Sequence, residues 1–453
     1  MMPIPDEGDH LTMVKAGTTF RLGQRLNQGG QGVVHKAVHG DSTFVVKWLR
    51  PFPYIDELRK SIGSLTERDS PHDSFIWPID LVTSEHVDSF GYIMNMLDSR
   101  FVSVGKIIPV DRSDSPVDSN FRTLTTIGRN LVDAFAALHG QGLCYRDISF
   151  GNLWVDPVLG DVRIIDNDNV GSDEGVVFIR GTGLFMAPEI VRDTKQHLPS
   201  TVTDLYSLAV LLFHIFMRGH PLDGMRSDST FSWIQSQHVS QTELHLRNYG
   251  FDPLFVFDPY DASNRPPPGD IRHTMWSLYP GFFRQLFVTS FTTGLHDASL
   301  TGRVMEAQWR RALLRLADCL SECRCGAAIF YDPGNPTLPC WRCGRVPPLP
   351  TLLNVRSARV VLSDGSLITS HHLHNDYRYD EIVGVVEAPR KRSQYQVVLR
   401  NKTTSTWTVT PEGEESRKVE PEQRLGVRPM VVDFGGVEGT IRLAEGAAVA
   451  PEQ

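Results

Sequence analysis

The sequence lacks any long hydrophobic run. Residues 1–14 contain no apolar core of the kind that a secretory signal peptide carries. No stretch approaches the roughly 20 consecutive apolar residues that a helix needs to cross a bilayer. These absences argue against secretion and against a membrane partner, and we expect a cytoplasmic protein.

An excess of positive charge is also missing. The chain carries 45 Lys and Arg against 53 Asp and Glu, which gives a formal net charge of −8. Non-specific binding to nucleic acid requires clustered cationic side chains, so we expect no nucleic-acid partner. The 453 residues, 41% of them hydrophobic, are enough for ordinary cores, and the length alone favours roughly two to four domains.

Cysteine is scarce and unevenly placed. Five of the six cysteines fall in one short segment, a pattern that in a cytosolic protein indicates metal binding and not disulfides. Two close pairs are predicted to hold one structural Zn²⁺ through four thiolates: Cys323, Cys325, Cys340 and Cys343. The first pair has one spacer residue fewer than the common knuckle. Cys319 is therefore kept as a reserve ligand, and disulfides or free thiols remain alternatives.

Three short motifs in the middle of the chain point to a particular chemistry. LCYRDISFGN begins at residue 143, VRIID ends at Asp166, and GTGLFMAPEIV begins at residue 181. Phosphoryl transfer needs one carboxylate that orients the attacking hydroxyl and two groups that hold Mg²⁺ on the phosphates. Asp147 would supply the first role, and Asn152 and Asp166 the second. Ordinary turn aspartates are the alternative reading.

Over about residues 20–317 these motifs resemble the H-R-D-L-x-x-x-N, D-F-G and A-P-E signature of the protein kinase superfamily. Tyr145 replaces the His of the first motif, and Asn167 and Asp168 replace the Phe and Gly of the second. The resemblance implies a bilobal fold, ATP and Mg²⁺ as cofactors, and Asp147 as the catalytic base.

The resemblance extends toward the N-terminus, where a glycine-rich segment is similar to the loop that covers ATP phosphates. Lys47 ends the run FVVK, which resembles V-A-I-K, and would pair with the α- and β-phosphates. The helix that follows would carry the acidic partner of Lys47. Glu57 is our candidate, with Asp56 and Glu67 as alternatives. The remaining residues implied at the nucleotide are Asn27, Gly29, Gly30, Gly32 and Val34 in the loop, Met94 as gatekeeper, and Met96 near the adenine.

Other positions of the family's second lobe also find counterparts. By resemblance Asp204 would accept hydrogen bonds from the catalytic-loop backbone, and Arg303 would pair with Glu189. An insert at about residues 219–280, rich in Pro and aromatic residues, is expected to pack against its own lobe.

Two positions bear on substrate and regulation. Ser149 stands where Ser/Thr kinases usually carry a Lys, which admits a small-molecule phosphotransferase, whereas Thr182 lies in a segment that resembles the peptide platform of protein kinases. Near Ser172, we hypothesise that Asp173 or Glu174 partners Arg146 in place of a phosphate. A solvated turn is the alternative.

The last hundred residues alternate in short apolar and polar runs separated by turn residues, which is an all-β pattern. The predicted fold class is α+β: a bilobal protein-kinase-like domain, a small zinc-ribbon-like unit and an all-β C-terminal domain. The predicted boundaries are 1–18 for an N-terminal extension, 19–317 for the kinase domain, 318–346 for the Cys-rich ribbon, 347–352 for a Pro-rich linker, 353–445 for a β-sandwich or barrel and 446–453 for a tail.

The whole arrangement looks like bacterial kinases that accompany von Willebrand A-type proteins and metal-dependent phosphatases in stress-related operons. The sequence thus predicts ATP- and Mg²⁺-dependent phosphorylation of Ser or Thr on a protein substrate, possible partners being those two classes. A nucleotide-binding pseudokinase scaffold and a small-molecule phosphotransferase are the alternatives.

Overall fold

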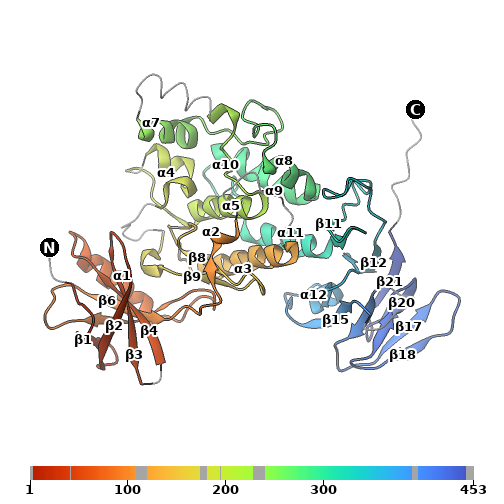
Figure 1. Ribbon diagram of the computed structural model, residues 1–453, viewed down its shortest axis with the longest axis horizontal. Coiled ribbons are helices and arrows are strands. Elements are labelled where there is room, and N and C mark those ends of the chain that lie inside the picture. The colour runs from red at the N-terminus through yellow and green to blue at the C-terminus, as the bar shows by residue number, and fades with distance from the viewer. Residues whose placement is uncertain are drawn as a thin grey trace. The chain divides into compact units, whose positions relative to one another are not determined.

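The computed structural model describes residues 4–40, 42–108, 120–173, 181–193, 195–227, 240–389 and 396–444. The predicted tail 446–453 and Glu174 lie outside these ranges. The chain divides into two compact units (Figure 1), which are described separately. Unit 1 comprises Met1–Asp114, Thr126–Arg272 and Leu286–Arg310, and unit 2 comprises Ser115–Thr125, His273–Gln285 and Arg311–Gln453.

Unit 1 opens with a closed antiparallel barrel in the order β1-β2-β3-β4-β6-β5. Its strands are β1 (His10–Met13), β2 (Thr19–Gln28), β3 (Gly32–His39), β4 (Ser42–Leu49), β5 (Pro78–Thr83) and β6 (Gly91–Asn95). Strands β3 and β4 pair without a register shift, so Val34 lies opposite Lys47. At Gly32 an added Cβ would lie 2.2 Å from the carbonyl oxygen of Trp48, so only glycine allows this close approach.

Helix α1 (Ile55–Thr66) covers part of this barrel. Its apolar residues recur at helical spacing, and Leu58, Ile62 and Leu65 are buried. Leu58 and Ile62 belong to one hydrophobic cluster with Tyr92 and Met94 of β6. One face of α1 therefore packs on the core.

The rest of unit 1 is mainly helical, and its most buried element is α5 (Thr201–Met217). Phe213 of α5 packs edge-on against Phe255, Phe287 and Phe291, so the predicted insert contributes Phe255 to the core of its own lobe. The other elements are β7 (Val102–Ser103), β8 (Leu153–Val155), β9 (Val162–Ile164), α2 (Val104–Ile107), α4 (Pro188–Arg192), α7 (Gln241–His245), α10 (Thr293–His296), the short helical turns η2 (Asn167–Asn169), η3 (Gly183–Phe185) and η4 (Leu246–Phe251), and the helices shared with unit 2, α3 (Phe121–Gly140), α8 (Ile271–Leu278), α9 (Gly281–Phe291) and α11 (Glu306–Asp318).

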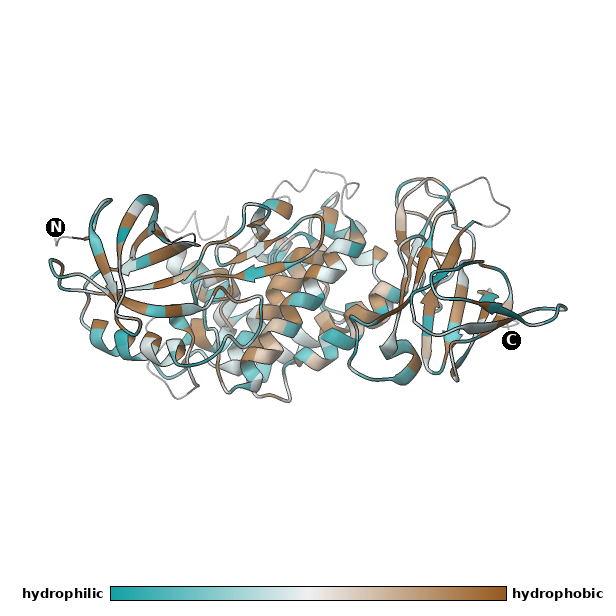
Figure 2. Ribbon diagram, turned by 90° about the horizontal axis from the view of Figure 1, so that it is seen from below, coloured by the Kyte–Doolittle hydropathy of each residue, from teal (hydrophilic) through white to brown (hydrophobic). Residues whose placement is uncertain are grey.

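Hydrophobic and hydrophilic residues alternate along the helices and strands (Figure 2). Within the described ranges, none of the helices has the length and apolar character needed to span a membrane.

Unit 2 carries a hairpin and two larger sheets. The hairpin consists of β10 (Leu320–Glu322) and β11 (Ala328–Phe330). A six-stranded sheet has the order β13-β12-β21-β20-β17-β18 and a four-stranded sheet the order β14-β15-β16-β19. Their bounds are β12 (Thr351–Val355), β13 (Ala358–Val361), β14 (Leu367–Thr369), β15 (Ile382–Glu387), β16 (Val398–Asn401), β17 (Trp407–Pro411), β18 (Arg417–Val419), β19 (Arg424–Gly426), β20 (Met430–Asp433) and β21 (Glu438–Leu443), with one short helix, α12 (Ser370–His374).

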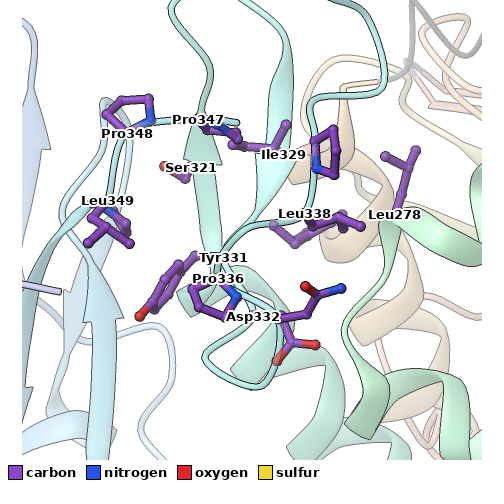
Figure 3. Close-up of a pocket in the computed structure, with 14 residues that line it drawn as sticks. Leu278, Ser321, Ile329, Tyr331, Asp332, Pro336, Leu338, Pro347, Pro348 and Leu349 are labelled. Atoms are coloured by element: carbon purple, nitrogen blue, oxygen red, sulfur yellow. The ribbon is translucent and has the colours of Figure 1, made fainter. Parts of the chain in front are cut away.

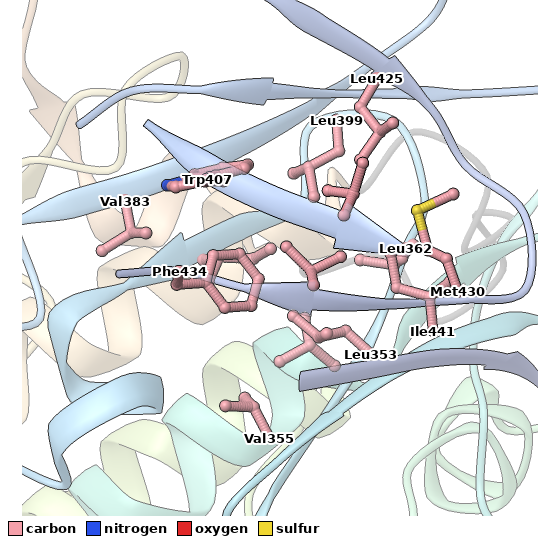
Figure 4. Packing of buried hydrophobic residues seen from close by; sticks show 14 of the residues in the cluster. Leu353, Val355, Leu362, Val383, Leu399, Trp407, Leu425, Met430, Phe434 and Ile441 are labelled. Atoms are coloured by element: carbon pink, nitrogen blue, oxygen red, sulfur yellow. The ribbon is translucent and has the colours of Figure 1, made fainter. Parts of the chain in front are cut away.

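The two sheets share one hydrophobic core (Figure 4). Trp407 and Ile441 of the larger sheet and Leu399 and Leu425 of the smaller sheet are each at most 2% exposed. Alternation along β17, whose burial pattern is buried, exposed, buried, exposed, buried, supplies inward side chains from every second residue. The β pattern of the sequence thus corresponds to two sheets that bury a common face.

The segment predicted as a Pro-rich linker packs within unit 2. Pro347, Pro348 and Leu349 line a small pocket together with Tyr331 and Leu338 (Figure 3). Leu349 also packs against a buried cluster that contains Tyr331. These contacts tie the cysteine-bearing hairpin segment to the first strand of the larger sheet.

Candidate active site

A side chain of α5 fixes the start of the catalytic loop by accepting two hydrogen bonds from the loop backbone. The Asp204 carboxylate accepts them from the backbone N–H groups of Tyr145, at 2.5 Å, and Arg146, at 2.9 Å, which confirms the predicted role of Asp204. Arg146 has a φ of 73°, a left-handed conformation that is uncommon outside glycine. The surrounding structure must hold such a residue in place, and Asp204 does so here.

Tyr145 joins the catalytic loop to the strand that precedes Asp166. Its side chain is fully buried against Phe75 and Phe135, and its hydroxyl donates a hydrogen bond to the carbonyl oxygen of Ile165. The Tyr that replaces the family's His therefore connects the two motifs that carry Asp147 and Asp166.

The structure brings Asp147, Asn152 and Thr182 together. Thr182 Oγ1 donates to Asp147 Oδ1 at 2.8 Å, and Asn152 Nδ2 donates to Asp147 Oδ2 at 3.1 Å and to the Asp147 carbonyl at 2.9 Å. Because its amide nitrogen is directed at Asp147, Asn152 would bind a cation through Oδ1. Oxygen is the ligand atom that Mg²⁺ prefers.

Asp166 lies just after β9 in a left-handed conformation, with a φ of 63°. Its Oδ1 accepts a hydrogen bond from Nζ of Lys47, and Lys47 also donates to Asp168 Oδ2 at 2.7 Å and to Gln31 Oε1 at 3.3 Å. Burial lowers the pKa of Lys47, but the neighbouring Asp168 and Asp166 outweigh this effect and raise it above the usual value. Lys47 therefore stays charged although it is only 5% exposed.

The predicted pairing of Glu57 with Lys47 is not found. Glu57 is exposed, and so is its alternative Asp56. The carboxylates that Lys47 contacts are those of Asp166 and Asp168. The physical reason is the orientation of α1, which turns its apolar face toward the barrel and so directs Glu57, next to Leu58, to solvent.

Asp168 contacts Lys47 but was not among the site residues predicted from the sequence. It is 1% exposed, and burial raises its pKa above the usual value although the nearby Lys47 opposes this effect. The available signal was the acid itself, at a position where the family motif has glycine.

The remaining residues predicted at the nucleotide lie on three strands of the barrel or directly beside them. Asn27 is in β2, Val34 in β3 opposite Lys47, and Met94 in β6 opposite Val45. Met94 is buried, while Met96 is exposed just beyond β6. Gly29 donates its backbone N–H to the carbonyl of Gly32 at 2.9 Å, which closes the turn that contains Gly30.

An ion pair supports the segment that carries the A-P-E motif. Arg303 donates to Glu189 Oε1 at 2.5 Å, and both side chains are at most 6% exposed. The guanidinium also lies 5.1 Å from the centre of the Tyr206 ring. The predicted Arg303–Glu189 pair is confirmed, and its burial suits a structural role.

Near Ser172 the contacts of Asp173 differ from the hypothesis. Arg146 donates to the Ser172 carbonyl oxygen, whereas the Asp173 carboxylate accepts hydrogen bonds from Thr201 N at 2.9 Å and Oγ1 at 3.0 Å. Asp173 therefore binds the first turn of α5. Glu174, the other proposed partner of Arg146, lies outside the described residues.

A buried histidine bridges two carboxylates beside the loop. His139 Nδ1 contacts Glu306, and Nε2 lies 3.2 Å from Asp204 Oδ2. Burial lowers the pKa of His139, but the hydrogen bonds to Asp204 and Glu306 prevail and raise it to about 9. The charged imidazolium thus holds the same carboxylate that binds the loop.

We expect this histidine to make stability depend on pH. The folded pKa of about 9 exceeds the ordinary value of 6.5, so the folded state binds the extra proton between these values. The free energy of unfolding should be highest below pH 6.5 and fall by on the order of 3 kcal/mol as the pH rises through 9. Urea unfolding at pH values from 6 to 9.5 measures this free energy of unfolding. His139→Gln should flatten the profile, and the exposed His10→Gln should not; a profile unchanged by His139→Gln would refute the assignment.

The four predicted thiols of unit 2 converge. Their sulfur atoms all lie within 4.8 Å of one another: Cys323, Cys325, Cys340 and Cys343. In two pairs, Cys323 with Cys343 and Cys325 with Cys340, the sulfurs are 3.7 Å apart. Zn–S bonds of about 2.3 Å in a tetrahedron imply sulfurs about 3.8 Å apart, so the arrangement fits Zn²⁺. Cys319 does not belong to the cluster.

Glycine turns shape both cysteine pairs. Gly326 and Gly344 have φ values of 79° and 68°, conformations that favour glycine. The Gly326 N–H donates to the Cys323 carbonyl at 2.8 Å, and the Gly344 N–H donates to the Cys340 carbonyl at 2.8 Å. A C-x-C-G turn therefore presents its sulfurs as a C-x-x-C-G turn does, despite the missing spacer.

Two curated proteins are similar to parts of this chain. The eIF-2-alpha kinase GCN2 of Schizosaccharomyces pombe is 28% identical over 155 residues, which are 28% of this chain and 10% of that protein. The probable serine/threonine-protein kinase PknB of Bifidobacterium longum is 27% identical over 247 residues, 50% of this chain and 33% of that protein. The chain therefore spans less than half the length of these curated relatives.

Among solved structures, the autoinhibited serine kinase domain of the giant muscle protein titin aligns with a TM-score of 0.44 and 14% identity, over 65% of this chain and 78% of that one. A family model described as a protein kinase domain matches residues 20–253, which is more than half of the 453 residues. The chain belongs to the protein kinase family.

Proposed function

We propose that the protein transfers the γ-phosphate of ATP to a Ser or Thr hydroxyl of a protein substrate. The observation that carries this proposal is the group formed by Asp147, Asn152 and Thr182, in which one carboxylate contacts both the candidate metal ligand and a hydroxyl. A substrate hydroxyl that takes the place of the Thr182 hydroxyl would meet Asp147 Oδ1 at hydrogen-bond distance. Asp147 would then orient it and accept its proton.

Lys47, Asn152 and Asp166 would hold the nucleotide. Asn152 Oδ1 and the Asp166 carboxylate are oxygen ligands of the kind that suits Mg²⁺, and bound Mg²⁺ would neutralise charge on the β- and γ-phosphates. Lys47 would position the phosphates. The turn at Gly29, Gly30 and Gly32 would lie over them, since Gln31 within that turn already contacts Lys47.

Protein is the preferred substrate class because Thr182 contacts the proposed base. Thr182 immediately precedes η3, whose Leu184 carbonyl accepts a hydrogen bond from the buried His220 at 2.8 Å. The predicted insert, which contains His220, thus supports the segment that resembles the peptide platform. The proposed partners are a von Willebrand A-type protein and a metal-dependent phosphatase, on the narrower resemblance described above.

The four-cysteine group would be a closed structural zinc site. All four tetrahedral positions would be filled by thiolates, so no position would remain for a substrate. Its role would be to stabilise the segment between α11 and β12.

The test incubates the full chain with γ-labelled ATP and Mg²⁺, together with general protein substrates, von Willebrand A-type candidates and a set of small molecules that carry hydroxyl groups. Transfer to protein that requires Mg²⁺ supports the proposal. Transfer to small molecules only would establish the alternative substrate class. A folded protein that binds ATP but transfers nothing would be a scaffold.

A further inference from the structure

Lys47 is a buried cation that needs a carboxylate partner. Its side chain is 7% exposed, and an unpaired buried charge is strongly destabilising. Helix α1 does not provide the partner, because the residues that it turns toward the barrel are Leu58 and Ile62. The acid must come from another element.

Asp168 comes from η2, the turn that directly follows Asp166. Its Oδ2 lies 2.7 Å from Lys47 Nζ, and its side chain is 2% exposed. Asn167 fixes this turn, because its Nδ2 donates to the Ile76 carbonyl at 2.8 Å and to the Ile164 carbonyl at 3.3 Å. The turn is thus anchored to the barrel side of the site, with Asp168 directed at Lys47.

Tyr92 of β6 is also buried near Asp168, and burial followed by the charge of Asp168 raises the pKa of its hydroxyl. Asp168 Oδ1 is buried as well. Among the described residues, Lys47 is the cation that the buried Asp168 carboxylate contacts.

Lys47 has a second carboxylate partner in Asp166, and we expect the two contacts with Lys47 to respond differently when Mg²⁺ binds. Asp166 is the proposed Mg²⁺ ligand, and a bound cation would compete with Lys47 for its oxygens. Asp168 would remain available to Lys47 when Asp166 turns to the metal.

We propose that Asp168 is the positioning residue that holds Lys47 and that it thereby leaves Asp166 free for Mg²⁺. A glutamate on the helix after β4 was expected to fill this role. This inference rests on the proposed function. It predicts that without Asp168 the Lys47 ammonium group pairs with Asp166 alone. Nucleotide binding then needs more Mg²⁺.

The experiment measures the binding of a fluorescent ATP analogue to the full chain while Mg²⁺ is titrated. Asp168→Asn should raise the Mg²⁺ concentration at half-maximal binding roughly tenfold, as expected for a directly coupled pair. Asp168→Gly, which restores the family's residue, provides a second variant should the first fail to fold. Asp80→Asn is the matched control, because Asp80 is a buried carboxylate of the same barrel whose hydrogen bonds within the described residues come from the backbone of Lys15 and Ala16.

A double-mutant cycle separates positioning from a simple loss of negative charge near the metal. If Asp168 acts through Lys47, adding Asp168→Asn to Lys47→Met changes the Mg²⁺ requirement by less than about twofold. Full multiplication of the two single effects would overturn the proposal, as would an Asp168→Asn protein that is folded and binds like the wild type. Failure of the wild type to bind any nucleotide would instead contradict the proposed function.

Discussion

An Asp147→Asn variant should transfer phosphate roughly 10²–10⁴ times more slowly than the wild type, the usual contribution of a positioned general base. The amide still accepts a hydrogen bond from Thr182 but cannot take a proton. Asp147 contacts Thr182 and Asn152 through separate oxygens, so the substitution keeps the size of the side chain and the acceptor for Thr182 but replaces the acceptor for Asn152 by an amide nitrogen. The measurement is the initial rate of label transfer from ATP at saturating Mg²⁺.

The matched control is Asp161→Asn. Asp161 is 40% exposed and pairs with Arg100 away from the site, so its rate should remain within about twofold, because surface ion pairs contribute little. Binding of the ATP analogue should persist in Asp147→Asn, which shows that the nucleotide site is intact. If Asp147→Asn keeps a third or more of the wild-type rate, Asp147 is not the base.

The family resemblance predicted the contacts that support the site. Asp204, Glu189 and Arg303 were assigned by resemblance to kinase motifs, and the structure places each in the expected contact. These contacts join elements whose relative position is fixed by the packing of α5, which is buried on almost every side. A family motif transfers well where the scaffold is rigid.

The partner of Lys47 could not be predicted in the same way. Helical spacing correctly directed Leu58 and Ile62 inward, but neighbouring helix residues point about 100° apart, and Glu57 is therefore exposed. Asp168 was seen only as a substitution for glycine. Its contact with Lys47 spans 121 positions of the sequence, and a pairing of this range follows from the fold and not from any local pattern.

The cysteine group shows the opposite case, in which an irregular spacing is compensated by a neighbouring residue. The short spacing between Cys323 and Cys325 put the first pair in doubt. The positive φ of Gly326 provides the turn, and the glycine after each pair was the signal in the sequence. The approach of Cys323 to Cys343 and of Cys325 to Cys340, each with sulfurs 3.7 Å apart, could not be read from spacing.

A Cys340→Ser/Cys343→Ser variant should lose about one equivalent of zinc per chain and unfold the segment around residues 323–345. The hydrophobic cluster there is small: Cys323, Ala327 and Cys340, with Ile329 and Trp341 packed against it. So few buried side chains cannot offset the cost of ordering the chain. Zinc bound by four thiolates contributes an apparent 10–16 kcal/mol in small zinc domains, roughly enough to decide whether the segment folds.

Metal content after gel filtration and amide hydrogen exchange together measure this result. In the variant, amides of residues 323–345 should exchange fast, while those of β17 and β20 stay protected because their core around Trp407 is separate from the cysteine cluster. Cys319→Ser is the matched control and should keep its zinc, since Cys319 lies outside the four-sulfur group. A wild-type protein that is purified without zinc, with reduced thiols and slow exchange at residues 323–345, would show that the fold of this segment does not depend on the metal.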